Sequence, residues 1–358
     1  MKKDINIWEI SISGKNRGRE DKEIDCKPYL PYNQYLYYNQ DEYNLVINKD
    51  NPDYLLVVIS HVLGKRELYE EFKRYYSNDR IIIFVGDESC FPDMNIFDYS
   101  ISYADDFSCG DRTYRVPTFV RFSYDEKQYE KVIDYEKEYE KRKFCNFIYS
   151  NPAAHPMRDK LFYEINKLKS VDSLGGHLRN VDSQIERDWN TFFEESVEMK
   201  SNYRFSITSE NDNLSGYTSE KILSSFFSKS IPIYWGNPNI TQEFNKDAFI
   251  NCNNFSNMDD LIGEIEHIDS NKELWIKMAS APMRTEEQIK RQEQDIIGYR
   301  EFIDHIFAQD IKRAKRVTLG THPQNYIHYY FDTLKWRRKL IQEGKAALWE
   351  TYCKILKR

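Results

Sequence analysis

Short apolar runs alternate with longer amphipathic stretches through most of this 358-residue sequence, and this alternation constrains the fold most strongly. The runs 5–12, 54–60 and 80–85 have the length and composition of buried strands, and 66–76 has a helical period. A strand, a helix and a further strand in this order predict a βαβ unit with parallel strands. We therefore predict an α/β protein.

A second α/β series begins near residue 144. It holds four predicted strands and three predicted helices, in the order strand 144–149, helix 156–169, helix 184–200, strand 204–208, helix 219–229, strand 231–235 and strand 248–251. The highly charged stretch 124–143 separates the two series and is typical of an exposed connecting helix. A chain of this length also exceeds the size at which one core usually stops growing. We therefore expect two lobes, 1–140 and 141–310, facing a cleft that can hold a ligand, followed by a helical basic tail at 311–358.

The composition excludes one class of function and limits the redox chemistry. A net charge of −7 argues against a nucleic-acid binder, whose surface should be basic. The 6 cysteines are scattered without a C-x-x-C pair, which indicates reduced thiols. The N-terminus lacks the apolar core of a signal peptide, and no apolar run is long enough to cross a bilayer. These features predict a cytoplasmic protein.

The tail combines basic residues with large apolar ones, at Trp336, Leu340, Leu348, Trp349 and Leu356. Such spacing could lay a helix on an anionic membrane surface, which predicts peripheral contact with the inner membrane. A helix docked back on the second lobe is the plainer alternative.

The most informative polar residues lie in 203–236, YRFSITSENDNLSGYTSEKILSSFFSKSIPIYWG. A strand there leads into a polar loop, the start of a helix and a further strand. The loop and the start of the helix carry five polar side chains, Glu210, Asn211, Tyr217, Glu220 and Lys221. Free N–H groups at a helix start, with a lysine, can bind an anion such as a diphosphate, and a glutamate can accept hydrogen bonds from sugar hydroxyls. An ordinary capped helix with a solvated Glu–Lys pair explains the same spacing.

The order of these residues resembles the α-1,3/4-fucosyltransferase family, glycosyltransferase family 10, of the bacterial type. The signature of that family is a strand, Glu-Asn, a spacer ending in Tyr, Thr-Glu-Lys, a helix and I/V-P-I/V-x-x-G. This chain has Glu210-Asn211, Tyr217, Ser219-Glu220-Lys221 and Ile231 to Gly236 (IPIYWG) in that order and at the family's spacing. The resemblance implies that Asn211, Tyr217 and Glu220 contact fucose, ribose or base, and that Lys221 binds the diphosphate.

Residues 144–180 resemble the preceding segment of the same family: a strand, Ser-Asn, an Arg-containing helix, Val-Asp, Gly and Arg-Asn. The family's nucleotide-binding arginine falls on Arg179, and Arg158 falls at its helix arginine. A planar guanidinium suits a diphosphate because it can donate two parallel hydrogen bonds. An arginine exposed in a glycine-rich loop is the alternative reading of Arg179.

Residues 82–117 resemble the acceptor-lobe block of the family, with a strand ending in an acidic residue, a proline, N-x-F-D-Y and R-x-P. Counting back without a gap from Pro92 and the block 95–99 (NIFDY) places Glu88 on the family's catalytic glutamate. Bacterial members have glycine before that glutamate, whereas Gly86 here stands one position further away. Asp87 is therefore the alternative base.

The resemblance implies a GT-B fold, with two Rossmann-like lobes facing a cleft and a helical C-terminal extension. It implies inverting transfer of L-fucose from GDP-β-L-fucose to a GlcNAc or glucose hydroxyl of an oligosaccharide or glycolipid, in α-1,3 or α-1,4 linkage. Inversion requires one base, here Glu88, and groups that hold the diphosphate, here Arg179, Lys221 and the helix start. A glycosyltransferase of the same fold with another nucleotide sugar, and an inactive relative that binds a GDP-sugar, are the alternatives.

No metal or other obligatory cofactor is expected. The pair Asp105-Asp106 lacks D-x-D spacing, and the histidines have no metal-ligand spacing. Cationic side chains can neutralise a diphosphate leaving group, so a divalent metal could stimulate the reaction without being required.

Overall fold

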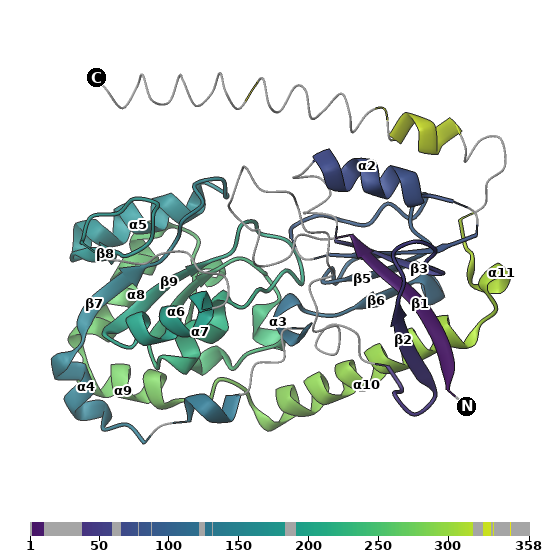
Figure 1. The fold of residues 1–358 in the computed structure, drawn as a ribbon. Helices are drawn as coiled ribbons and strands as arrows, with labels where there is room; N and C mark the ends of the chain where they lie inside the picture. The colour runs from purple at the N-terminus through teal and green to yellow at the C-terminus, as the bar shows by residue number, and fades with distance from the viewer. Residues whose placement is uncertain are drawn as a thin grey trace.

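The protein forms two lobes, each built on a parallel sheet, which lie side by side in Figure 1. The computed structural model describes residues 2–10, 38–58, 66–77, 79–86, 88–121, 126–130, 132–182, 191–317, 325–330, 332 and 344. The apolar tail positions Trp336, Leu340, Leu348, Trp349 and Leu356 lie outside these residues, so membrane contact by the tail stays a prediction. Within them, no helix combines the length and the apolar character needed to cross a membrane.

The first sheet has six parallel strands in the spatial order β2-β1-β3-β4-β5-β6. Along the chain they are β1 Lys3–Ile10, β2 Tyr43–Ile47, β3 Tyr54–Val58, β4 Ile81–Val85, β5 Tyr99–Ser102 and β6 Thr113–Arg115. Strands β3 and β4 read YLLVV and IIIFV because a parallel sheet is covered on both faces. Helix α2, Arg66–Tyr75, covers one face, where Leu68 and Phe72 share a core with Trp8 and Phe84.

The second sheet has five parallel strands in the order β11-β10-β9-β7-β8. Along the chain they are β7 Lys143–Phe147, β8 Val171–Ser173, β9 Tyr203–Ser209, β10 Ile231–Trp235 and β11 Ile250–Asn251. Helices contribute to two cores around it: α5 Met157–Leu168, α8 Met258–Ser270 and α9 Lys272–Ser280 to one, α6 Phe192–Lys200 and α7 Lys221–Phe227 to the other. The α/β alternation predicted from the sequence is confirmed in both lobes.

The connection between the sheets differs from the single exposed helix expected at 124–143. Two shorter elements stand there, the 3-10 helix η4 Glu126–Tyr129 and the α-helix α4 Tyr135–Lys141. A new helix begins because the Asp134 carboxylate accepts a hydrogen bond from the Lys137 backbone N–H at 3.3 Å. Helix α4 also packs against α9, since the rings of Tyr139 and Trp275 lie 5.6 Å apart.

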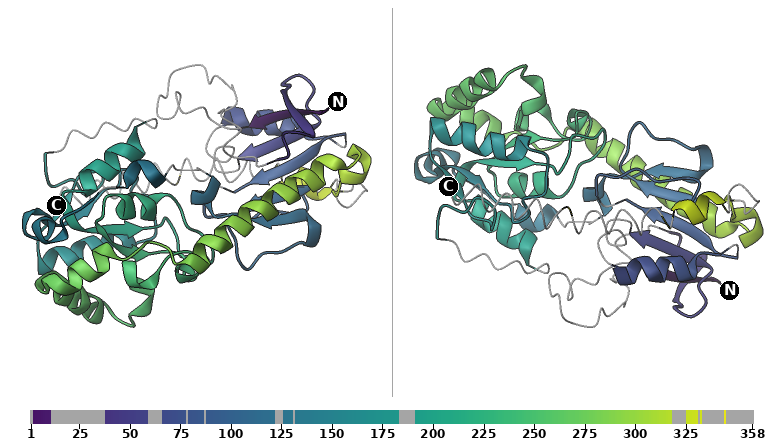
Figure 2. Two further views of the ribbon diagram at one scale, coloured as in Figure 1. Left: turned by 90° about the horizontal axis from the view of Figure 1, so that it is seen from below. Right: turned by 90° about the horizontal axis from the view of Figure 1, so that it is seen from above.

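Helix α10, Glu286–Ala308, runs from the second lobe to the first (Figure 2). Near its start, the Gln288 side chain donates to the backbone oxygen of Thr241 in the second lobe at 2.9 Å. Near its end, Lys3 Nζ on β1 donates to the Phe307 backbone oxygen at 2.6 Å. One helix therefore fastens both lobes.

The chain after the middle of α10 belongs by its contacts to the first sheet, although we expected 141–310 to form the second lobe. The Tyr114 ring on β6 stacks on Tyr299 at 6.1 Å and on Phe302 at 5.6 Å. Amphipathic spacing predicts that a helix has an apolar face, but not which sheet that face covers. The remaining helical elements are short: η3 Gly110–Arg112, α3 Thr118–Arg121, η5 Ile240–Gln242, η6 Lys246–Ala248, η7 Cys252–Asn254 and α11 Ile311–Ala314.

A buried carboxylate, Asp98, ties the segment after α11 to the first sheet. One of its oxygens accepts from the Ile82 N–H at 2.8 Å and from Lys315 Nζ at 3.0 Å. The other accepts from the backbone N–H groups of Arg316 at 2.9 Å and Val317 at 2.8 Å. Four donors compensate the burial of this charge. The N-x-F-D-Y block thus contains a structural aspartate.

An ionic cluster joins the lobes where β6 ends. Arg115 on β6 pairs with Asp105 of the first lobe, with 2.9 Å between Nε and Oδ1, and its terminal nitrogen pairs with Glu243 of the second lobe. The Asn239 amide of the second lobe also donates to Asp105, at 2.9 Å. Because these groups are largely shielded from water, their attraction is screened little by salt.

Gly216 of the second lobe lies against the backbone of the first lobe at Tyr103 and Asp105. Its φ of +83° belongs to the left-handed region that favours glycine. A Cβ atom there would lie 2.2 Å from the Tyr103 backbone oxygen and 2.9 Å from the Asp105 nitrogen. The sequence needs glycine here because both the backbone conformation and the space exclude a side chain.

We therefore predict that Gly216→Ala lowers the free energy of unfolding by about 1–3 kcal/mol, the usual magnitude for a strained backbone position. Urea denaturation measures the change. Gly263→Ala is the matched control, because Gly263 lies within α8 with nothing within 4 Å of an added Cβ. It should stabilise the protein by about 0.5–1 kcal/mol. Equal effects of the two substitutions would contradict the assignment of strain to Gly216.

Candidate active site

Three residues singled out in the sequence meet where the lobes contact each other. Glu88 follows β4 of the first sheet, and Asn211 follows β9 of the second. The Asn211 amide nitrogen donates to Glu88 Oε2 at 2.8 Å, and the Tyr217 hydroxyl donates to the same oxygen at 2.9 Å. The Glu88 side chain is otherwise exposed. Asp87, the alternative base, lies outside the described residues.

Glu210 is completely buried at the end of β9. One carboxylate oxygen accepts from the Ser219 N–H at 2.8 Å, and the other accepts from the Ser219 hydroxyl at 2.7 Å. Lys221 Nζ completes the set at 3.2 Å from the second oxygen. A buried carboxylate requires such partners, so Glu210 fixes the chain that leads into α7.

The start of α7 differs from the hydroxyl-capped helix expected at 219–229. The helix has seven residues and begins at Lys221, with Glu220 at the N-cap position and no side-chain cap. The Ser219 hydroxyl, which we expected to be able to cap, instead donates to Glu210 at 2.7 Å and accepts from Lys221 Nζ at 2.9 Å.

Lys221 remains charged in this setting. Burial alone lowers the pKa of an ammonium group, but the carboxylates of Glu210, Glu220 and Glu88 together raise the pKa of Lys221 above its ordinary value. The Glu220 side chain, next to Lys221 in the chain, is partly exposed. An anionic ligand that bound Lys221 would therefore bind a cation that already interacts with three carboxylates.

Arg158 donates a hydrogen bond to the Asn211 side chain. It lies on α5, is almost fully buried, and its guanidinium stacks over the Tyr149 ring at 4.2 Å. One terminal nitrogen donates to the Asn211 side-chain oxygen at 2.7 Å and to the Ser209 backbone oxygen at 3.3 Å. Its contacts are therefore with the protein interior and with Asn211.

Arg179 lies in the loop after β8, at the same edge of the sheet as the loop after β9. Its Nε donates to the Gly175 backbone oxygen at 3.1 Å, and its terminal nitrogens have no recorded partner among the described residues. The side chain is exposed. The preceding Leu178 has a φ of +55°, a conformation that non-glycine residues adopt mainly where the surroundings impose it. Arg179 can thus offer a planar pair of donors.

A residue not singled out in the sequence, Lys200, lies beneath the start of α7. Its buried Nζ donates to the hydroxyls of Ser224 at 2.7 Å and Ser225 at 3.0 Å, and to the Lys221 backbone oxygen at 3.3 Å. Burial is the main cause that lowers the pKa of Lys200, to about 7. Its spacing of three residues from Val197, on the apolar face of α6, was the available signal.

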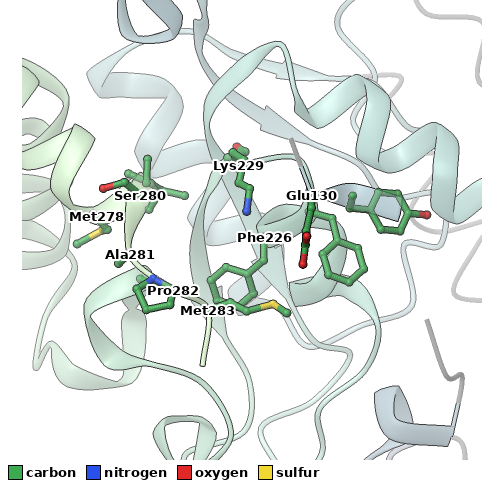
Figure 3. A pocket seen from close by; sticks show the side chains of 14 residues that line it. Glu130, Phe226, Lys229, Met278, Ser280, Ala281, Pro282 and Met283 are labelled. Atoms are coloured by element: carbon green, nitrogen blue, oxygen red, sulfur yellow. The ribbon is translucent and has the colours of Figure 1, made fainter. Parts of the chain in front are cut away.

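A cavity among the described residues lies elsewhere. It holds about 210 Å³ between Phe226, Lys229 and Glu130 on one side and the segment 278–283 on the other (Figure 3). Lys229 and Ser230 precede β10, whereas the groups above follow β4, β8 and β9. The cavity is thus at the opposite edge of the second sheet and contains none of the candidate residues.

Two solved structures share the architecture described here. The crystal structure of an α1,3-fucosyltransferase with GDP-fucose aligns with a TM-score of 0.56 and 22% identity, over 72% of this chain and 81% of that chain. The crystal structure of α1,3-fucosyltransferase with GDP aligns with a TM-score of 0.61 and 21% identity, over 83% and 91%. The protein therefore has the two-lobed GT-B fold that we expected from the sequence.

Residues 138–298 match the family described as glycosyltransferase family 10 (fucosyltransferase) C-term. The α-(1,3)-fucosyltransferase FucT of Helicobacter pylori is 28% identical over 280 residues, 69% of this chain and 55% of that protein. The putative fucosyltransferase R654 of Acanthamoeba polyphaga mimivirus is 34% identical over 147 residues, 40% of this chain and 24% of that protein. The chain thus spans about half the length of the first of these relatives and a quarter of the second. Residues 138–298 are thus similar to glycosyltransferase family 10, as the resemblance indicated.

The position of Lys200 predicts a pH dependence of stability. Its pKa is about 7 in the folded protein and has the ordinary value of 10.5 in the unfolded chain, so unfolding takes up a proton between these values. Stability from this group therefore rises with pH above about 7, by at most about 1.4 kcal/mol per pH unit.

The unfolding free energy of the wild type should accordingly rise by about 2 kcal/mol relative to that of Lys200→Met from pH 7 to pH 9. Urea titrations at several pH values measure it. Lys277→Met, at an exposed position of α9, should run parallel to the wild type. A Lys200→Met profile that is also parallel would show that Lys200 is not perturbed.

Proposed function

We propose that this chain transfers L-fucose from GDP-β-L-fucose to a hydroxyl of a glycan acceptor, with inversion at the anomeric carbon. The observation that carries the proposal is the contact of Glu88, from the first lobe, with Asn211 and Tyr217 of the family motif in the second lobe. In the proposed reaction the acceptor and the donor sugar meet between the two lobes, so the general base must also lie there. Glu88 is a carboxylate at this place. The similarity of residues 138–298 to family 10 supports the donor half of the proposal.

In the proposed reaction, Glu88 is the general base. Its carboxylate takes the proton of the acceptor hydroxyl as the oxygen attacks the anomeric carbon, and the bond from that carbon to the GDP oxygen breaks on the opposite face. No covalent intermediate is needed. The exposed Glu88 side chain is accessible to an acceptor from solvent.

The leaving diphosphate requires positive charge. Lys221, which its carboxylate neighbours keep protonated, and Arg179, with its outward terminal nitrogens, are the proposed donors to it. We assign Glu220, at the start of α7, to a sugar or ribose hydroxyl. Because two cations serve the diphosphate, we propose that no metal is required. Full transfer activity after treatment with EDTA would agree with this.

The proposed acceptors are GlcNAc or glucose units of an oligosaccharide or glycolipid, in α-1,3 or α-1,4 linkage. Two other functions are the alternatives, and the second is suggested by Gly86, which stands one position further from Glu88 than in the family. A same-fold enzyme would use another nucleotide sugar, and an inactive relative would bind GDP without turnover. Thermal shifts with a panel of nucleotide sugars, followed by transfer assays on a glycan array, separate the three.

For the base, we predict that Glu88→Gln lowers kcat by about 10²–10⁴-fold, because only the proton acceptor is lost. Binding of GDP, measured by calorimetry, should stay close to that of the wild type. Asp87→Asn is the comparison that fixes the register, and its effect should be much smaller. The reverse ranking would make Asp87 the base, and full activity of both variants would place the base elsewhere.

For the donor site, we predict that Arg179→Ala weakens GDP binding by about 2–3 kcal/mol through the loss of a charge-assisted hydrogen bond to phosphate. Lys221→Ala should weaken it similarly but should also lower the melting temperature, because it leaves buried Glu210 without its cation. Calorimetry and thermal melting separate the two effects. Lys169→Ala, before β8 at the opposite edge of the sheet, is the control. Unchanged GDP affinity in both site variants would rule out the assignment.

A further inference from the structure

We propose that the cavity at the carboxyl end of α7 is a binding site for a small organic carboxylate with an apolar body, separate from the site proposed for GDP-fucose. The cavity holds about 210 Å³ and lies at the opposite edge of the second sheet from Asn211 and Arg179 (Figure 3). Apolar walls, the ammonium group of Lys229 and the buried hydroxyl of Ser230 together define the chemistry of the ligand.

Apolar side chains form much of the wall. They come from α7, from β10 and η6 after it, and from the segment at the end of α9. The side chains are those of Phe226, Phe227, Ile231, Ala248, Met278 and Met283. An apolar cavity of about 150 Å³ can hold a benzene molecule, so the volume of about 210 Å³ can hold one ring with a carboxylate. Methionine side chains can adjust to such a ligand because they are flexible and polarizable.

Lys229 directs its side-chain nitrogen into this cavity, between Glu130 and the segment 278–283 (Figure 3). Lys229 is half-buried, and burial lowers the pKa of Lys229, an effect that Glu130 partly opposes. Glu130 itself is exposed, and within the described part of the chain no hydrogen bond or ion pair is recorded for the Lys229 nitrogen. A carboxylate in the cavity would accept a hydrogen bond from the ammonium group and offset its loss of hydration.

The backbone of Lys229 is unusual for a residue with a side chain. Its φ of +57° lies in the left-handed region that glycine normally occupies just after a helix. The Lys229 N–H donates to the Phe226 backbone oxygen at 3.0 Å, and the Lys229 backbone oxygen accepts from Arg142 at 2.8 Å. Such strained positions are concentrated at active sites and ligand sites. Glycine would end α7 equally well, but it could not place an ammonium group at the cavity.

Ser230 adds a second polar group next to Lys229. Its side chain is 1% exposed, and its hydroxyl oxygen has no hydrogen-bond partner among the residues that the structure describes. Buried hydroxyl groups are usually hydrogen-bonded, so a buried one without a partner requires an explanation. A carboxylate has two oxygens. When one accepts from Lys229, the other is available to accept from the Ser230 hydroxyl.

Benzoate is the probe for this site, because it has one ring and one carboxylate. In NMR spectra of the full chain labelled at its methionine methyl groups, benzoate should shift the signals of Met278 and Met283 with a Kd of about 0.1–1 mM, as is usual for a ligand of this size. The signal of Met157 should not move, because Met157 begins α5 next to Arg158 at the candidate active site. Saturating GDP should leave the affinity for benzoate unchanged.

A neutral analogue and two variants test the role of Lys229. Benzyl alcohol should bind about tenfold more weakly than benzoate, because it has no charge to pair with the ammonium group. Lys229→Met should weaken benzoate binding about tenfold and leave the affinity for benzyl alcohol unchanged. Lys277→Met, at an exposed position of α9, removes the same charge and should bind benzoate like the wild type. An unchanged melting temperature of Lys229→Met would show that this variant is folded.

Four results would overturn the proposal. Benzoate binding that GDP abolishes, or that shifts Met157, would place the anion at the candidate active site. Equal affinities for benzoate and benzyl alcohol, with no effect of Lys229→Met, would show that the cavity selects only for an apolar body. Tighter binding of benzylamine would assign the selection to Glu130. The absence of any saturable shift of Met278 and Met283 would refute the site. None of these measurements uses transfer activity, so the proposed function is tested separately.

Discussion

The burial of the Glu210 carboxylate is the interaction on which the functional half of the structure depends. Its carboxylate lies buried at the end of a central strand and accepts from the Ser219 N–H, the Ser219 hydroxyl and Lys221 Nζ. These hydrogen bonds fix Ser219 and Lys221, and with them the point at which α7 can begin. Asn211 is the next residue in the chain, so the same anchor determines where its amide can reach. The buried Glu210 carboxylate thereby sets the position of both the Lys221 ammonium group and the Asn211 contact to the other lobe.

The two lobes are joined by contacts of different kinds that support each other. Arg115 forms shielded ion pairs with Asp105 and Glu243, and Gly216 allows the two backbones to approach. Helix α10 contacts both lobes. With the lobes joined in this way, Glu88 lies within hydrogen-bond distance of Asn211 and Tyr217. Such an arrangement suits a protein whose chemistry occurs between lobes, because the geometry of a site between two bodies is only as well defined as their docking.

The sequence was sufficient for what depends on local pattern. The apolar runs of β3 and β4 and the amphipathic period of α2 predicted the centre of the first sheet, because burial on two faces leaves a plain signature. The shorter strands β2, β5 and β6 were not predicted. The family motif drew attention to the loop between β9 and α7. It could not show that Asn211 and Tyr217 contact Glu88, since that contact joins residues more than a hundred positions apart.

Other features were missed for the same physical reason. Lys200 reads as a surface lysine until the hydroxyls of Ser224 and Ser225 are seen around it. The apolar face of α10 has the correct period, but nothing in that period says that Phe302 and Phe307 pack against the first sheet. The sequence pattern predicts that one face of a helix is buried. Only the tertiary contacts show which part of the protein that face packs against.

The return of α10 to the first sheet has a consequence for how the protein is made. The strand β1 emerges from the ribosome long before α10, because Lys3 bonds to a backbone oxygen 304 residues later in the chain. The face of the first sheet that α10 covers therefore stays uncovered until α10 has been translated. Such a sheet can aggregate during synthesis, because its exposed apolar surface can bind other unfolded chains. The second lobe, whose strands and covering helices all lie between residues 143 and 280, can assemble first and give the earlier sheet a partner to close upon.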